Sequence, residues 1–178
     1  MEQLQIHSVS ISHKNIRKLN VMHQEYTYPI GLFDGASMNN IGGIGIYLMI
    51  INDYFYCVRM GCDHSTNTCA ELLALWVLLT FANMLGLPYL HIRGDSSAII
   101  NWFNRRVDLS SLELEGWCRN IRALQDSFAH LEATHVYREY NDKADSLSKE
   151  ALGLNSGYLH YMEFIEGKCS GRDSFQFY

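Results

Sequence analysis

Four acidic side chains stand at positions from which a fold could bring them to one point: Asp34, Glu71, Asp95 and Asp145. A carboxylate is costly to bury without a partner, so acids that a fold gathers must share protons or bind cations. Hard oxygen ligands of this kind suit magnesium. Two divalent ions about 3.5 to 4 Å apart can activate a water and stabilise the charge that develops during phosphodiester hydrolysis. The four acids therefore indicate a two-metal site.

Two of these acids are expected on strands. Asp34 closes the apolar run 29–34 and is followed at once by a glycine-rich turn sequence, which places it near the end of a strand. Asp95 follows the strand pattern 89–93, which Gly94 stops. Both carboxylates are thus predicted at strand ends.

The other two acids are expected on helices. Asn67 or Thr68 can cap a helix, and Glu71 is predicted in its first turn, as the exception among core neighbours. Asp145 begins a helix whose apolar residues repeat at helical spacing: Ala144, Leu147, Ala151 and Leu152. Any one of the acids could merely favour a helix start through the helix dipole. That explanation predicts no shared order among the four.

The order of the elements predicts an α/β domain. A mixed five-stranded sheet is expected, with three antiparallel strands, two parallel additions and flanking helices. Residues 28–152 would form this domain, and 1–27 and 153–178 would be N-terminal and C-terminal arms. The predicted elements are strands 28–34, 43–51 and 54–61, helix 68–85, strand 89–93, helices 96–104 and 110–129, strand 132–138 and helix 142–152.

These residues resemble the type 1 ribonuclease H family, whose catalytic carboxylates come in the order Asp, Glu, Asp, Asp. The run 138–149 is most similar to the ribonuclease H domain of plant retroelement reverse transcriptases. The resemblance extends over most of the chain, from about Pro29 to Leu152. Its segments are Phe33-Asp-Gly-Ala-Ser37, Thr66-Asn67 with Ala70-Glu71, Gly94-Asp95-Ser96, and Arg138-Glu-Tyr-Asn141 with Ala144-Asp145.

The resemblance implies a ribonuclease H-like fold and an endonuclease that cuts the RNA strand of RNA/DNA hybrids and leaves 5′-phosphate ends. It also implies that Asp34 bridges two Mg2+ ions, that Glu71 and Asp95 complete the first site, and that Asp145 completes the second. Mn2+ would be able to substitute. An RNA/DNA hybrid is the implied partner, and a reverse transcriptase polyprotein is the implied parent chain.

Family members read the hybrid through its minor groove, where the 2′-hydroxyl distinguishes RNA from DNA. By resemblance, the substrate contacts would come from Gly35, Asn40, Thr66, Asn67 and Ser96. Serine and asparagine beside glycine are also ordinary turn formers, so a purely structural role stays open for them.

Two departures from the family pattern affect the expected activity. Family members often use a histidine on the loop before the last helix to assist product release, but the loop 138–142 contains none, and His135 is interpreted as a strand-face residue. The turn Asn39-Asn40-Ile41-Gly42 lacks the proline that is usual there. We expect slower turnover, or another proton donor, and looser positioning of the hybrid.

Composition limits the alternatives. The chain has 178 residues, of which 48% are hydrophobic and 19% charged, as in one ordinary globular domain. Its net charge of −5 weakens nucleic-acid binding without excluding it. Arg105-Arg106 form a basic pair beside Trp102 and Phe103, and we expect these two aromatic residues in the core.

Five irregularly spaced cysteines argue against a disulfide framework and a zinc site and favour an intracellular location. The apolar run 72–79 is too short to span a membrane. We expect a monomer that binds no membrane.

A second interpretation remains: a catalytically silent ribonuclease H-like module, derived from a retroelement, that binds nucleic acid or protein. Retention of all four acids favours the enzyme. A small-molecule metallophosphatase is disfavoured because the chain lacks a distinct phosphate-binding loop.

Overall fold

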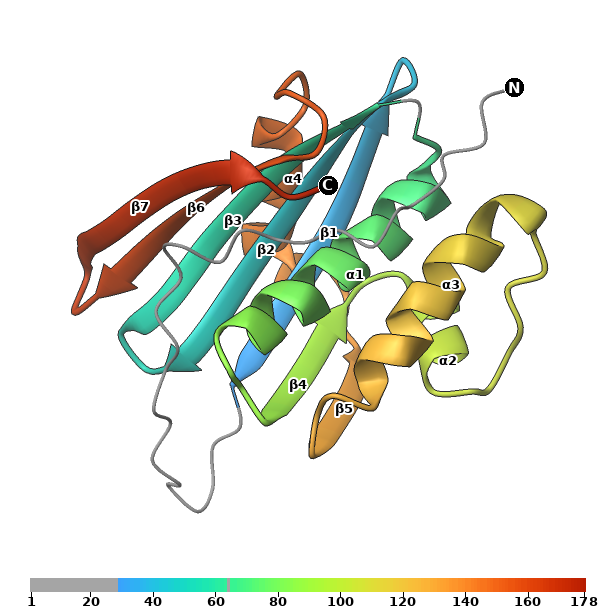
Figure 1. The fold of residues 1–178 in the computed structure, drawn as a ribbon, viewed down its shortest axis with the longest axis horizontal. Coiled ribbons are helices and arrows are strands. Elements are labelled where there is room, and N and C mark those ends of the chain that lie inside the picture. The colour runs from blue at the N-terminus through green and yellow to red at the C-terminus, as the bar shows by residue number, and fades with distance from the viewer. Residues whose placement is uncertain (1–28, 64) are drawn as a thin grey trace.

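The computed structural model describes residues 29–63 and 65–178, and these form a mixed sheet with helices on both faces (Figure 1). The strand order is β5-β4-β1-β2-β3-β6-β7. The antiparallel pairing of β1 with β2 and of β2 with β3, and the parallel pairing of β4 with β1 and of β5 with β4, confirm the predicted arrangement. These strands span Ile30–Met38 (β1), Ile41–Ile51 (β2), Tyr54–Asp63 (β3), Tyr89–Gly94 (β4) and His130–His135 (β5).

The predicted number of five strands is wrong, because the sheet has seven. The additional strands, β6 (Tyr158–Ile165) and β7 (Lys168–Gln176), come from the segment 153–178 that the sequence led us to treat as an arm. They form a hairpin whose turn residues Glu166 and Gly167 both have positive φ, as favoured hairpin turns require. Strand β6 pairs with β3, and Leu159 is fully buried. The predicted arm 1–27 lies outside the described residues.

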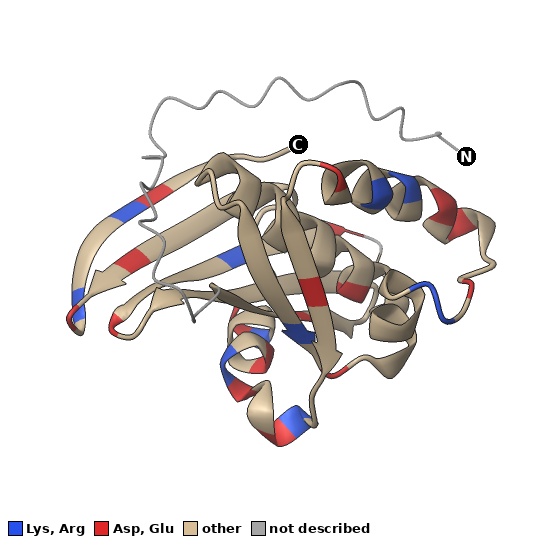
Figure 2. Cartoon of the chain, turned by 90° about the horizontal axis from the view of Figure 1, so that it is seen from below, with Lys and Arg blue, Asp and Glu red and all other residues tan. Residues whose placement is uncertain are grey.

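The helices divide between the two faces of the sheet. Figures 1 and 2 show α1 (Asn67–Met84) and α3 (Leu112–Gln125) on one face and α4 (Asp142–Glu150) on the other. The short helix α2 (Ser97–Phe103) follows β4, and a 3-10 turn, η1 (Arg138–Tyr140), precedes α4. Charged residues lie on α3, on α4 and near the hairpin turns (Figure 2). Helix α1 contains one charged residue, Glu71.

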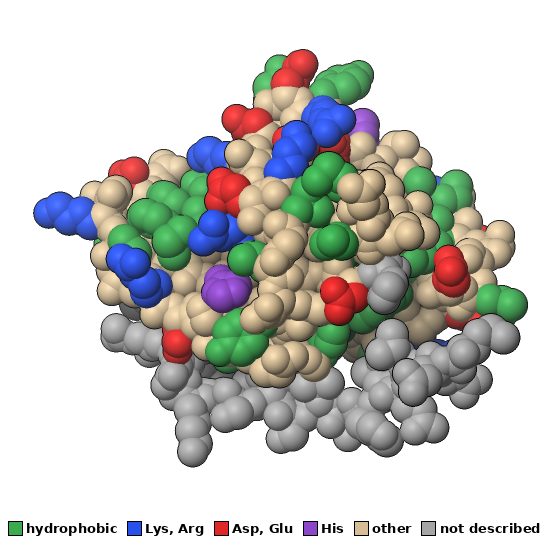
Figure 3. All heavy atoms as spheres, turned by 90° about the horizontal axis from the view of Figure 1, so that it is seen from above, with side chains coloured by type: hydrophobic (Ala, Val, Ile, Leu, Met, Phe, Trp, Pro, Cys, Tyr) green, Lys and Arg blue, Asp and Glu red, His purple; other side chains and the backbone are tan. Residues whose placement is uncertain are grey.

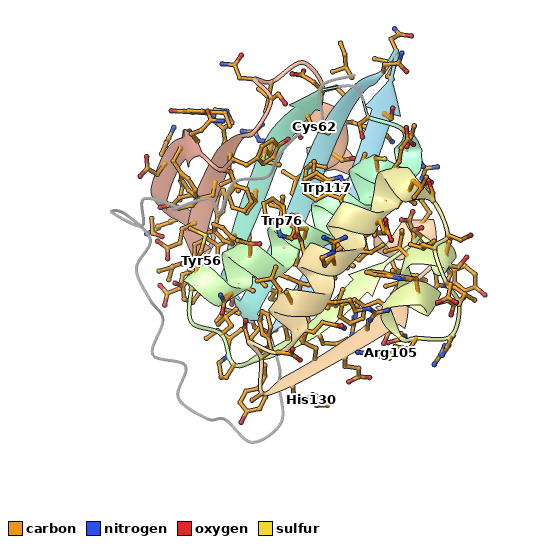
Figure 4. The ribbon with its side chains drawn as sticks, turned by 45° about the vertical axis from the view of Figure 1, so that its right-hand side comes forward. Tyr56, Cys62, Trp76, Arg105, Trp117 and His130 are labelled. Atoms are coloured by element: carbon orange, nitrogen blue, oxygen red, sulfur yellow. The ribbon has the colours of Figure 1, made fainter. Side chains whose placement is uncertain are left out.

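Helix α1 is the centre of the core. It packs between the sheet and α3, where Trp76 and Trp117 face one another with ring centroids 5.4 Å apart (Figure 4). In the sequence, the apolar run 72–79 is too short to span a membrane, but the whole of α1 is long and apolar enough to do so. However, 67% of its residues are buried inside the protein. Its apolar surface is therefore explained by packing. Trp102 and Phe103 are also buried, as predicted.

Several element ends differ from the prediction. Strand β1 continues past Asp34 to Met38, because Asn39 and Asn40 both adopt positive φ and close a tight hairpin with β2. Asp34 therefore lies in the middle of a strand, not near its end. Strand β5 ends at His135, and Arg138 belongs to η1 instead of to the strand.

Candidate active site

Asp34 is positioned by β1 and by the helix that crosses behind it. It pairs in register with Gly45 of β2, so both residues face α4. A side chain at Gly45 would meet the Ser148 nitrogen at 2.2 Å and the Ala144 oxygen at 2.3 Å, which shows how closely α4 approaches the sheet. This approach brings the buried Ser148 hydroxyl to Asp34, to which it donates a hydrogen bond at Oδ2.

Glu71 approaches from the opposite side of the sheet. A side chain at Gly35 would meet the Ala70 carbonyl carbon at 2.2 Å, so only glycine allows β1 to lie this close to α1. Glu71 is 7% exposed, and a backbone hydrogen bond links it to Gly35. The prediction for the start of α1 was wrong: the cap is Thr66, whose hydroxyl accepts from the Cys69 amide, and Glu71 consequently lies in the second turn.

Asp95 follows β4 directly, as predicted. The amide Nδ2 of Asn141 donates to Asp95 Oδ1 at 3.2 Å and to the Phe33 carbonyl at 3.0 Å. Asn141 is fully buried, so it ties the end of β4 to β1 just before α4 begins. His135, interpreted as a strand-face residue, has its Nε2 at 3.1 Å from the Asp95 carbonyl oxygen.

Three of the four predicted carboxylates meet. Each of Asp34, Glu71 and Asp95 offers an oxygen, and these atoms all lie within 4.8 Å of one another. Asp145 does not belong to this group. Its Oδ1 accepts from Arg138 at 3.0 Å, and its Oδ2 accepts from Lys149 at 2.5 Å.

The two parts of the site differ in electrostatics. Burial, followed by the negative charges of Asp34 and Asp95, raises the pKa of Glu71 to about 9. Burial also raises the pKa of Asp34, although the hydrogen bond from Ser148 opposes this rise. Burial would raise the pKa of Asp145 as well, but the hydrogen bonds from Lys149 and Arg138 outweigh it and lower that pKa. In the part of the chain that the structure describes, no lysine or arginine forms an ion pair with the three-acid group, whereas Asp145 is neutralised by Arg138 and Lys149.

The acids line an open cavity of about 610 Å3. The space-filling view from above shows lysine and arginine side chains next to carboxylates in the upper part of this face (Figure 3). Besides the four acids, the cavity is lined by Arg138, Lys149 and the predicted contact residues Gly35, Asn67 and Ser96. It is therefore acidic at its floor and carries two cations at its edge.

The other two predicted contact residues lie outside this lining. Asn40 is in the β1–β2 turn, where its carbonyl accepts from the Ser65 amide at 3.1 Å. The side chain of Thr66 is used to cap α1. Both residues thus shape the hairpin and the helix start next to the cavity.

Comparison with known proteins matches this chain to ribonucleases. Residues 32–151 match a protein family described as reverse transcriptase-like. The protein named ribonuclease HI from Halobacterium salinarum is 32% identical over 123 residues, which cover 67% of this chain and 62% of that protein. The chain thus spans less than two thirds of the length of this relative.

Solved structures give the same fold. The crystal structure of ribonuclease H1 from Halobacterium salinarum matches with a TM-score of 0.62 at 27% identity and covers 70% of this chain and 97% of that one. A ribonuclease H1 isolated from compost and solved in complex with an RNA/DNA hybrid matches with a TM-score of 0.65 at 23% identity, over 70% of this chain and 96% of that one.

Proposed function

Because the chain belongs to the type 1 ribonuclease H family, we propose that it is a metal-dependent endonuclease that hydrolyses the RNA strand of RNA/DNA hybrids and leaves 5′-phosphate ends. The observation that carries this proposal is the group formed by Asp34, Glu71 and Asp95 at the floor of an open cavity. A small apolar substrate would form no favourable contact with these carboxylates.

The residues present fit a divalent cation. Glu71 Oε2 is buried and has no hydrogen-bond partner among the described residues, which is costly unless a cation completes its environment. The donors are all carboxylate oxygens, a set that suits Mg2+, with Mn2+ as a substitute. When bound there, divalent ions would activate the attacking water and stabilise the charge on the phosphate. Asp34, Glu71 and Asp95 would hold the first ion, and Asp145 with Asp34 the second.

The chain supplies the remaining functions around these acids. Ser148 and Asn141 fix the orientations of the Asp34 and Asp95 carboxylates through hydrogen bonds. Arg138 and Lys149 place positive charge at the cavity edge, where a phosphate of the substrate would lie. Asn67 and Ser96 offer polar groups in the lining that could contact a 2′-hydroxyl.

The direct test is cleavage of a labelled RNA/DNA hybrid by the purified protein with Mg2+ or Mn2+. We expect cleavage of the RNA strand in the hybrid and none in single-stranded RNA. The Asp95→Asn variant should lose at least about two orders of magnitude in rate, since it removes one carboxylate from the group. An intact hybrid for both proteins would refute the enzymatic function.

If the hybrid stays intact, the alternative function is a catalytically silent module that binds nucleic acid or protein. It is favoured by one observation, the neutralisation of Asp145 by Lys149 and Arg138. We further propose that the domain derives from a retroelement reverse transcriptase, which the reverse transcriptase-like match supports.

A further inference from the structure

We propose that the Lys149 ammonium takes the place of the second cation in the free protein, so that the site binds one divalent ion tightly and exposes Asp145 to another only when Lys149 leaves it. This inference rests on the proposed function, because it concerns the cations of the same site. Lys149 would be a positioning residue, because it would affect the second divalent ion only by occupying Asp145 or releasing it.

The distribution of ion pairs carries this inference. Three side-chain ion pairs occur among the described residues, and two of them are on Asp145. Lys149 lies one helical turn after Asp145 on α4, at the i,i+4 spacing that lets the two side chains meet. With Lys149 on Oδ2 and Arg138 on Oδ1, both carboxylate oxygens of Asp145 are already occupied.

The other three acids show the opposite situation. The carboxylates of Asp34 and Asp95 accept hydrogen bonds from the side chains of Ser148 and Asn141, which are neutral. Glu71 belongs to the three-acid group, and its Oε2 is buried and has no hydrogen-bond partner among the described residues. Among the described residues no cation forms an ion pair with these three acids, so a divalent ion bound there would displace none.

Lys149 can leave Asp145 because the two cationic partners of Asp145, Lys149 and Arg138, are both exposed to solvent. The side chains of Lys149 and Arg138 are 56% and 73% exposed, whereas that of Asp145 is 18% exposed. An ion pair of this exposed kind opposes a competing cation by only about two- to fivefold. A substrate phosphate would give Lys149 an alternative anionic partner. Lys149 would therefore weaken the second ion in the free protein without excluding it from the working enzyme.

The test is a calorimetric titration of the full chain with Mn2+ in the absence of nucleic acid. We expect one tight binding event for the unmodified protein and a second, weaker one. The Lys149→Met variant should strengthen the second event about two- to fivefold and leave the first unchanged, because only Asp145 loses a competing cation, the one on Oδ2, while Arg138 stays on Oδ1. Adding Asp145→Asn to this variant should abolish the gain.

Lys143→Met is the matched control. Lys143 lies on the same helix and its removal changes the net charge equally, but its ammonium lies 4.2 Å from the centroid of the Tyr47 ring instead of on an acid. We expect this variant to bind Mn2+ like the unmodified protein. If the Lys149 and Lys143 variants bind Mn2+ alike, or if the unmodified protein binds two ions with equal affinity, the inference is overturned. Failure to cleave a hybrid would refute the proposed function but would not alter these titrations.

Discussion

At the scale of single residues, the burial of Glu71 and its acidic neighbours make its carboxylate costly to ionise unless a cation binds. Burial, with Asp34 and Asp95 nearby, raises its pKa to about 9, so the metal-free protein keeps a proton on this carboxyl near neutral pH. A divalent cation favours the charged carboxylate and would displace that proton. Metal binding should therefore become tighter as the pH rises towards 9.

A first prediction concerns the stability of the metal-free protein. The ordinary pKa of a glutamate is 4.5 and that of folded Glu71 is about 9, so the folded state binds more protons than the unfolded state between these values. Stability therefore falls as the pH rises through this window. Glu71→Gln removes the ionisation, so its stability relative to that of the unmodified protein should rise by on the order of 4 kcal/mol between pH 5 and pH 8, at about 1.4 kcal/mol per pH unit. Urea denaturation with a chelator measures this, and a pH-independent difference would contradict the raised pKa.

The acids themselves could be recognised from the sequence, but their partners could not. Each acid interrupts an apolar pattern or starts an element, and this sets it apart from its neighbours. Asn141 belonged to a segment that carries the family resemblance but was given no role, and Ser148 lies near the end of α4, where a serine gives no signal of its own. Their hydrogen bonds depend on the register of β1 and on the packing of α4. The spacing of Asp145 and Lys149 was a signal that could have been used.

At the scale of elements, the site depends on two close approaches of backbone to backbone. Helix α1 meets β1 at Gly35, and α4 meets β2 at Gly45. The sequence predicted the type and order of these elements because periodicity and turn residues are local signals. It misplaced the start of α1 and the end of β1, because several polar residues could serve as the cap or the turn.

A second prediction tests the contact between α4 and the sheet. Gly45→Ala would place Cβ at 2.2 Å from the Ser148 nitrogen, so α4 must move away from β2. We expect a loss of about 1–3 kcal/mol in the free energy of unfolding. Cleavage should fall further than the loss of folded protein explains, since Ser148 and Asp145 would move away from Asp34.

Gly116→Ala is the control for that substitution. Gly116 lies within α3, and a Cβ there meets nothing within 4 Å. This variant should gain up to about 1 kcal/mol in stability from the higher helix propensity of alanine. Equal effects of the two substitutions, measured by urea denaturation, would contradict the importance of the α4 contact.

At the scale of the whole molecule, the C-terminal hairpin is part of the fold. Strand β6 extends the sheet beyond β3, and Phe177 after β7 is fully buried, with its ring 5.2 Å from that of Trp76 on α1. The sequence did not predict this, because the segment 153–178 has mixed polarity, and its partners, the edge of β3 and Trp76 on α1, are distant in the sequence. The core formed by α1 therefore extends beyond the expected domain boundary.

A third prediction follows from this packing. Phe177→Ala should cost about 3–5 kcal/mol in the free energy of unfolding, because it leaves a cavity against Trp76. Ile165→Ala, at a residue that is 42% exposed, should cost far less. Thermal denaturation of both variants measures the difference, and a harmless Phe177→Ala would indicate that the C-terminal segment does not contribute to the core.

The most direct test of the proposed function combines cleavage and stability in one variant, Asp34→Asn. Asp34 belongs to the three-acid group and is crowded by Asp95 and Asp145, which contribute to its raised pKa. We expect the unmodified protein to cleave the RNA strand of a labelled hybrid with Mg2+. We expect Asp34→Asn to abolish this cleavage while its melting temperature in chelator is equal or higher, since one of several crowded acids is removed. Cleavage by the variant at the rate of the unmodified protein, or an uncut hybrid with the unmodified protein, would contradict the assignment of this site as a ribonuclease H centre.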